Sequence, residues 1–121
     1  MSKRILIVED HEDNRRIMRD LLTSAGYDLL EAETGEEGVS LAGTHLPDLI
    51  LIDIQLPGLD GYGATRSIRS NPALREIPII AVSSYALSGD DVKALEAGCD
   101  AYVTKPFSPR ALLAKIREYL G

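Results

Sequence analysis

Asp53 directly follows four apolar residues, Leu49–Ile52, and a Pro57-Gly58 turn comes soon after it. A short, unbroken apolar run of this kind is typical of a strand buried on both faces. Open α/β sheets keep their chemistry at the carboxyl ends of their strands, which is where this carboxylate lies. A carboxylate oxygen is a nucleophile, and its attack on phosphorus would give an acyl phosphate.

Other groups suited to this chemistry also end strand-like runs. These are Glu9 and Asp10, Ser83 and Ser84, and Lys105. In a parallel sheet they would meet at one edge, where neighbouring strands lie about 4.8 Å apart. Two carboxylates about 5 Å apart repel by roughly 3 kcal/mol at an effective dielectric near 20. The pattern therefore predicts a divalent cation among the acids, and hard oxygen ligands favour Mg²⁺. The lysine and a serine hydroxyl would bind phosphoryl oxygens.

The segments that must position these groups alternate between strand and helix five times. Strands are predicted over residues 3–8, 27–32, 49–52, 77–82 and 101–103. This alternation predicts an α/β fold with a doubly wound parallel sheet. The first, third and fourth strands are the most apolar and belong in the middle. Right-handed crossovers then favour the flavodoxin-like strand order 2-1-3-4-5.

Helix signals refine this prediction. Asp13 is the predicted N-cap of the first helix, which buries Ile17 in its apolar stripe. Asp60 is predicted to cap the third helix, and Ser108, followed by Pro109, is predicted to cap the fifth. The fourth helix is predicted to bury Val92 and Leu95.

Composition narrows the class of protein. The chain has 121 residues, a formal charge of −6 and one cysteine, Cys99. We expect a single domain over residues 1–121 with no output domain, and no disulfide. The sequence has no apolar run long enough for a membrane span and no signal-peptide pattern, so we expect a cytoplasmic protein without membrane contact. The acidic balance argues against direct binding of nucleic acid.

Four segments together resemble the receiver domain of two-component response regulators, a family with the same superfamily fold as the chemotaxis receivers. The segments lie in the family's order and at its spacing, and they are Ile7–Asp10, Leu51–Gly61, Ile79–Ser84 and Tyr102–Phe107. Within the family, residues 54–57 and 86–90 are most similar to stand-alone receivers of the DivK type. The resemblance implies a phosphorelay switch that catalyses only its own phosphorylation and dephosphorylation.

The resemblance also implies a role for each matching residue in the phosphoryl site. Asp53 would be the phosphoacceptor and a metal ligand, beside Asp10 and the backbone carbonyl of Gln55. Glu9 would hold metal-bound water, and Lys105 would bind the phosphate. The peptide bond between Lys105 and the following proline, Pro106, resembles the family's cis peptide.

The switch and the lifetime of the phosphoryl group depend on other positions. Ser83 matches the switch hydroxyl, and Tyr102 matches the aromatic residue that changes rotamer with it. The alternatives are a serine that only satisfies backbone groups and a static edge tyrosine. Ser84 departs from the Ala or Gly usual in the family, and with Gln55 and Tyr85 it would tune hydrolysis.

The partners implied are a sensor histidine kinase or a histidine phosphotransfer protein, and a downstream protein that contacts the face of the fourth helix, fifth strand and fifth helix. Donor recognition is expected at the start of the first helix, around Asn14, Arg15 and Met18, and in the loop after the fifth strand. The protein is expected to be a monomer or weak dimer. Two other enzymatic or carrier functions fit less well. An Asp-nucleophile phosphatase would resemble Asp-x-Asp, where this chain has Gln55, and an FMN carrier would not place acids after its first strand. A pseudo-receiver, a binding module without phosphorylation, would lack part of the acid set or the lysine.

Overall fold

The computed structural model describes residues 2–83, 90–105 and 108–121. Strands and helices alternate along the chain, with one 3₁₀ turn (η1) before the fourth strand. Their bounds are β1 Arg4–Val8, α1 Glu12–Ser24, β2 Asp28–Ala32, α2 Gly35–His45, β3 Leu49–Asp53, α3 Gly61–Arg69, η1 Pro72–Leu74, β4 Ile79–Ser83, α4 Asp90–Ala97, β5 Ala101–Thr104 and α5 Pro109–Leu120. No helix in the described ranges is long and apolar enough to cross a membrane.

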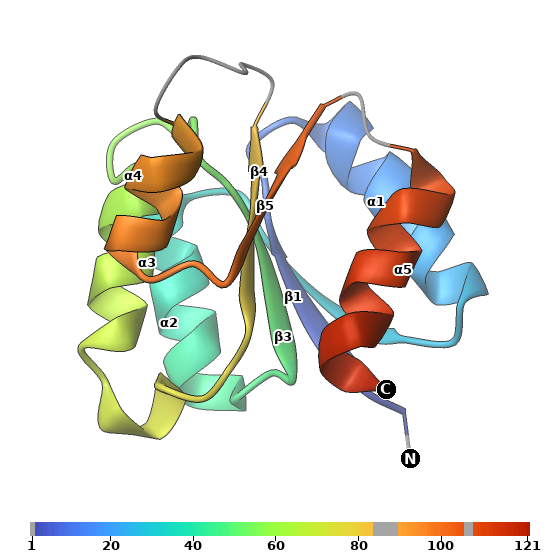
Figure 1. The fold of residues 1–121 in the computed structure, drawn as a ribbon, viewed down its shortest axis with the longest axis horizontal. Coiled ribbons are helices and arrows are strands. Elements are labelled where there is room, and N and C mark those ends of the chain that lie inside the picture. Colours follow the sequence, from blue (N-terminus) through green and yellow to red (C-terminus); the bar gives the residue numbers. More distant parts are fainter. Residues whose placement is uncertain (1, 84–89, 106–107) are drawn as a thin grey trace.

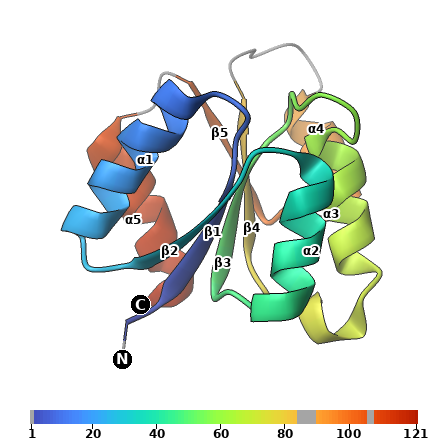
Figure 2. The ribbon, with the colours of Figure 1, turned by 180° about the vertical axis from the view of Figure 1, so that it is seen from behind.

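The five strands form one parallel sheet in the order β2-β1-β3-β4-β5, as predicted. Helices α1 and α5 cover one face, and α2, α3 and α4 cover the other (Figure 1; Figure 2 shows the opposite side). The core is therefore divided into two layers. Met18 and Leu22 of α1 pack with Leu112 and Ile116 of α5 on one side of the sheet. The layer on the other side includes Ala64 of α3.

Register places the strand ends side by side. Val8 of β1 lies beside Ile52 of β3, and Asp53 lies beside Val82 of β4. Residues that follow β1 and end β3 are therefore neighbours at the carboxyl edge. All strands run in the same direction, so their carboxyl ends lie at one edge of the sheet. The sequence predicted the phosphoryl site at this edge.

Helix α1 differs from its prediction at two points. It begins at Glu12 with His11 as the N-cap and no side-chain cap, so the prediction that Asp13 caps it is wrong. Ile17 is 56% exposed and does not enter the core. The buried face runs through Arg15, Met18 and Leu22 instead. The helix is rotated so that Arg15 faces inward, where an apolar residue was expected.

Helix α4 also differs from its prediction. Val92 and Leu95 are 51% and 54% exposed, so the prediction that they are buried is wrong. The residues that α4 buries are Ala94 and Ala97. Two small residues on the inner face let the helix backbone lie close to the sheet, and this leaves the larger side chains on the outer face. The predicted start of this helix at Ser88 and Gly89 lies outside the described residues.

The predicted caps of the third and fifth helices are confirmed. Asp60 Oδ1 accepts a hydrogen bond from the Gly63 N–H at 2.8 Å and caps α3. Ser108 Oγ accepts from the Ala111 N–H at 3.4 Å and caps α5, which has Pro109 in its first turn. Strand β4 begins two residues later than predicted, at Ile79, and ends one residue later, at Ser83.

Candidate phosphoryl site

Three charged side chains from different strands meet at the carboxyl edge of the sheet. Glu9 follows β1, Asp53 ends β3, and Lys105 follows β5. The Lys105 ammonium donates hydrogen bonds to Glu9 Oε1 and, at 3.1 Å, to Asp53 Oδ2. The side chains of Glu9, Asp53 and Lys105 are 0%, 6% and 11% exposed. The structure therefore brings these three predicted site residues into one buried ion-paired group.

Local backbone structure fixes the Asp53 carboxylate. Its Oδ1 accepts a hydrogen bond from the Gln55 N–H at 2.9 Å. The backbone then turns back, and the Gly61 N–H donates to the Ile54 carbonyl at 2.9 Å. A Cβ at Gly61 would lie only 2.4 Å from the Asp53 carbonyl oxygen, so this close approach requires glycine. One carboxylate oxygen is thus held by the backbone while the other faces the lysine.

Glu9 is held at its backbone as well as at its carboxylate. Its N–H donates to the Ala32 carbonyl at 3.0 Å, and its own carbonyl accepts from Arg15 Nη1 at 2.7 Å. Its Oε2 accepts from the His11 N–H at 3.2 Å. Glu9 consequently has partners on both carboxylate oxygens.

Asp10 is different, because one of its oxygens lacks a partner. Asp10 Oδ1 is buried and makes no hydrogen bond to any described residue. The nearest cationic candidate is His11 Nδ1 at 3.2 Å, without the geometry of a hydrogen bond, and the His11 side chain is 70% exposed. Ligand atoms of Glu9, Asp10 and His11 lie within 4.8 Å of one another. A buried carboxylate oxygen without a donor fits a small cation, which would supply the missing charge.

The donor chemistry also fits Mg²⁺. The acids offer hard oxygen ligands, and Mg²⁺ prefers these while keeping several waters. The imidazole of His11 is a softer ligand that Mg²⁺ disfavours. The oxygens of this group therefore suit the ion predicted from the sequence, and the histidine is an exposed neighbour.

Lys105 changes the expected electrostatics of the site. The acids were predicted to repel one another in the absence of a divalent ion, but the ammonium lies between Glu9 and Asp53. Burial alone would lower the pKa of Lys105. The hydrogen bond to Glu9 and the charge of Asp53 outweigh burial and raise that pKa above its usual value of 10.5. The lysine stays charged and relieves repulsion for two of the three acids, leaving Asp10 without such a partner.

Ser83 lies beside this group and Tyr102 lies in β5, and their switch roles remain predictions. Ser83 ends β4 beside Thr104, is 1% exposed, and accepts the Lys105 N–H at its backbone carbonyl at 2.6 Å. Tyr102 of β5 is half-buried and packs against the apolar layer that α2, α3 and α4 cover. Neither residue is without an interaction partner in the structure.

Several predicted residues are not tested by the described geometry. Gln55 is exposed, and its carbonyl as a metal ligand remains a prediction. Ser84, Tyr85 and Pro106 lie outside the described residues, so the tuning positions and the predicted cis peptide stay predictions.

Arg15 has a role that the sequence prediction missed. It was expected at a donor-recognition surface with Met18, but both side chains are buried, so neither can form that surface. Arg15 lies three residues before Met18 and seven before Leu22, so all three residues share one face of the helix. This spacing could have predicted that Arg15 is buried.

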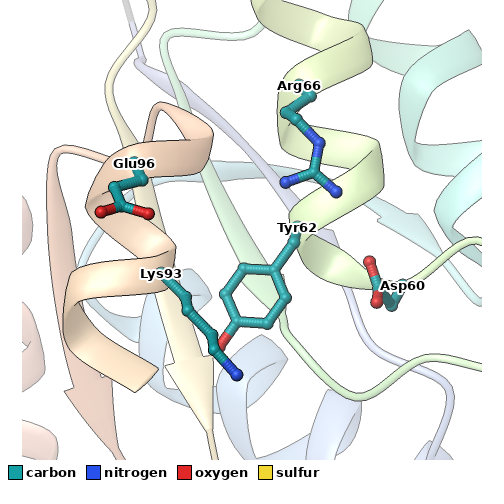
Figure 3. Close-up of a pocket in the computed structure, with 5 residues that line it drawn as sticks. All are labelled: Asp60, Tyr62, Arg66, Lys93 and Glu96. Carbon is teal, nitrogen blue, oxygen red and sulfur yellow. The ribbon is translucent and has the colours of Figure 1, made fainter. Parts of the chain in front are cut away.

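A separate pocket lies between α3 and α4, and none of its five lining residues belongs to the group formed by Glu9, Asp10, Asp53 and Lys105 (Figure 3). It has a volume of about 560 Å³. Asp60, Tyr62 and Arg66 come from the α3 side, and Lys93 and Glu96 come from α4. Its acidic and basic residues are equal in number. It therefore lacks the excess negative charge of the site at the sheet edge.

Fold and acid group together define a receiver-type α/β domain. The chain belongs to the response regulator receiver domain family, whose model matches residues 5–117. It is 42% identical to the polar-differentiation response regulator DivK of Brucella ovis over 121 residues, covering all of this chain and 98% of that protein. DivK of Brucella anthropi is likewise 42% identical over the same lengths.

Solved structures agree with this placement. The receiver domain of the sensor histidine kinase PA1611 from Pseudomonas aeruginosa is 38% identical, with a TM-score of 0.93 over 100% of this chain and 99% of that one. That domain has a magnesium ion coordinated in its active-site cleft. The chemotaxis protein CheY4 of Vibrio cholerae, 23% identical, has a TM-score of 0.93 over 98% of this chain and 99% of that one, and shares the fold.

Proposed function

We propose that the chain is a phosphoacceptor switch in which Asp53 takes a phosphoryl group with Mg²⁺ bound nearby. The observation that carries this proposal is the convergence of Asp53, Glu9 and Lys105 at the carboxyl edge, beside an Asp10 oxygen that has no hydrogen-bond donor among the described residues. A purely structural ion pair would not need a third carboxylate without a cation.

In this proposal Asp53 supplies the nucleophile. Oδ1 accepts the backbone N–H of Gln55, whereas Oδ2 accepts the side-chain ammonium of Lys105, which can turn to a phosphoryl oxygen, so we assign Oδ2 as the oxygen that attacks phosphorus. The new bond joins Oδ2 to phosphorus, and the bond from phosphorus to the donor's histidine nitrogen breaks. Lys105 then exchanges a carboxylate partner for a phosphoryl oxygen, and its raised pKa keeps it charged.

Glu9, Asp10, Asp53 and the carbonyl of Gln55 are the groups that would hold Mg²⁺. When bound, the ion would neutralise negative charge on the phosphoryl oxygens. The magnesium ion in the PA1611 receiver supports this assignment by analogy. Ser83 would donate to another phosphoryl oxygen, and water would later release the group.

The partners of the switch follow from its class. We propose a sensor histidine kinase or a histidine phosphotransfer protein as donor. The signal would leave by protein contact through α4, β5 and α5, with Ser83 and Tyr102 biasing two packings of that face. We also propose a cytoplasmic regulator with one receiver domain over residues 1–121, without direct nucleic-acid contact and as a monomer or weak dimer. The 42% identity to DivK supports its class as a response regulator.

Acetyl phosphate tests the central step. The wild-type protein incubated with acetyl phosphate and Mg²⁺ should gain one phosphoryl group by intact mass, and hydroxylamine should remove it as expected for an acyl phosphate. Asp53→Asn should not be labelled. Asp20→Asn, which removes an exposed carboxylate from α1, should be labelled like the wild type. Equal labelling of Asp53→Asn would show that the acceptor is another residue. Absence of labelling in the wild type would favour a pseudo-receiver.

A further inference from the structure

Arg15 is a buried cation beside the acid group, and its contacts differ from those of an ordinary surface arginine. Its side chain is 7% exposed. Nη2 pairs with Glu12 at 2.5 Å and with Glu33 at 3.1 Å, and Nε lies 3.6 Å from Glu31. These carboxylates come from α1, β2 and the residue after β2. The guanidinium is therefore fixed on three sides by negative charge.

The remaining nitrogen, Nη1, contacts the phosphoryl site. It donates to the Glu9 carbonyl at 2.7 Å in a buried hydrogen bond. That carbonyl belongs to the peptide that joins Glu9 to Asp10. The other side of Glu9 is held by its N–H, which donates to the Ala32 carbonyl at 3.0 Å. The backbone of this turn is thus pinned at two points.

The orientation of this peptide sets where the two acids point. With the Glu9 carbonyl turned toward Arg15, the Glu9 carboxylate contacts Lys105, and Asp10 keeps one buried oxygen free of donors. A rotation of the peptide would move both carboxylates. Groups that orient metal ligands from behind in this way commonly contribute 10- to 100-fold to metal affinity.

We propose that Arg15 is a positioning residue that orients the Glu9–Asp10 peptide for binding a divalent cation. This inference rests on the proposed function, since it assigns Arg15 a task at the same site. Arg15 touches neither the cation nor the phosphoryl group and acts only through the carbonyl of Glu9.

Arg19 offers a matched control one helical turn away. It pairs with Glu31 at 2.7 Å and with Glu12 at 3.3 Å, two of the same carboxylates, and it forms no other ion pair within the described residues. Removing either arginine deletes one positive charge on α1. That loss of charge alone should strengthen attraction of a cation to the acids. Weaker binding in an Arg15 variant must therefore come from lost orientation and not from electrostatics.

The experiment compares Arg15→Met, Arg15→Lys and Arg19→Met with the wild type. Mg²⁺ affinity is measured by calorimetric titration, and thermal unfolding is recorded without Mg²⁺ to establish that each protein is folded. Arg15→Met should raise the Mg²⁺ Kd about tenfold or more. Arg19→Met should leave it unchanged or lower. Arg15→Lys keeps a donor but loses the planar fork, so it should fall between wild type and Arg15→Met.

Phosphorylation by acetyl phosphate gives a second readout. The Mg²⁺ concentration for half-maximal labelling should rise in Arg15→Met, while the rate at saturating Mg²⁺ stays close to that of the wild type. A folded Arg15→Met protein whose Mg²⁺ Kd equals that of Arg19→Met would overturn the inference. If Arg15→Met does not fold, an unchanged Kd in Arg15→Lys would overturn it equally. A wild-type protein that neither binds Mg²⁺ nor is labelled would instead refute the proposed function.

Discussion

Opposite ends of the same sheet use ion pairs in different ways. At the carboxyl edge, Glu9 and Asp53 share the ammonium of Lys105, and Asp10 makes no ion pair with it. At the amino ends of β4 and β5, Arg69 pairs with Asp100 at 2.7 Å. The first group has more acids than bases. The second, which we call the Arg69 clamp, consists of Arg69, Asp100 and the carbonyls that Arg69 contacts, and its charges are matched one to one.

The Arg69 clamp also satisfies its polar atoms. Arg69 Nε donates to the Gly98 carbonyl at 2.9 Å, and Nη1 donates to the Ile77 carbonyl at 2.7 Å. Asp100 accepts the Ile79 N–H at 2.8 Å in addition to its salt bridge. One arginine thereby joins the end of α3, the loop before β4 and the end of α4.

The difference separates a structural ion pair from a functional one. A structural pair gains most when every donor and acceptor is satisfied, because unsatisfied buried groups are costly. The carboxyl edge keeps a buried oxygen of Asp10 unsatisfied and an excess of negative charge. Such an arrangement is less stable as it stands, and under the proposed function a cation and a phosphoryl group would supply the missing interactions.

The sharpest test removes the ammonium group of Lys105 from the carboxyl edge. Lys105→Met leaves Glu9, which is fully buried, without its main counter-charge. Removing one partner of a buried ion pair typically costs about 3–5 kcal/mol, and we expect about 3 kcal/mol in the unfolding free energy without Mg²⁺. Adding Mg²⁺ should restore a large part of this loss, as measured by urea unfolding. A loss that Mg²⁺ does not restore would mean that the site is structural in the same sense as the Arg69 clamp.

The matching change at the other end is Arg69→Ala. It leaves several carbonyls and Asp100 without their donor, but the site is partly solvated, because the Asp100 side chain is 41% exposed. We expect a loss of about 2 kcal/mol in urea unfolding, with no recovery on adding Mg²⁺. Arg66→Ala on the same helix is the control, since Arg66 is exposed and should change stability by less than about 0.5 kcal/mol. A recovery with Mg²⁺ would contradict the distinction between the two ends.

A third change, at Asp10, should raise the unfolding free energy instead of lowering it. Asp10→Asn removes one negative charge from the carboxyl edge without removing a hydrogen bond made by Oδ1. We expect the unfolding free energy without Mg²⁺ to rise by up to about 1 kcal/mol, because repulsion falls. The same variant should lose most of its stabilisation by Mg²⁺ in thermal unfolding. Destabilisation without Mg²⁺ would show that the acids are already balanced.

The fold could be predicted because its signals are local and repeated. Apolar runs such as Leu49–Ile52 and caps such as Asp60 and Ser108 each act within a few residues. Strand order followed from how apolar each run is. The meeting of Glu9, Asp53 and Lys105 then followed from parallel strands ending at one edge.

The errors came from choices that depend on tertiary contacts. Periodicity placed Ile17 inside, but the carbonyl of Glu9 and the carboxylates of β2 and the turn after it draw Arg15 into that layer. Small residues decided the rotation of α4, where Ala94 is buried and Leu95 is exposed. The lysine was expected to serve the phosphate, and its present bridge between two acids depends on side-chain geometry that strand order cannot reveal.

The smallest expected effect lies at Cys99, which follows Gly98 of the Arg69 clamp. Burial raises the pKa of its thiol above the usual 9.0, although the nearby Thr65 hydroxyl and the charge of Arg69 oppose the shift. The folded protein thus holds this proton more tightly than the unfolded chain. Above pH 9 the unfolded thiol ionises first, so stability due to Cys99 is complete below pH 9 and is lost as pH rises through the folded-state pKa. The difference in unfolding free energy between the wild type and Cys99→Ala should therefore narrow between pH 8 and pH 10.5 in urea titrations. A constant difference over this range would mean that the thiol titrates alike in both states.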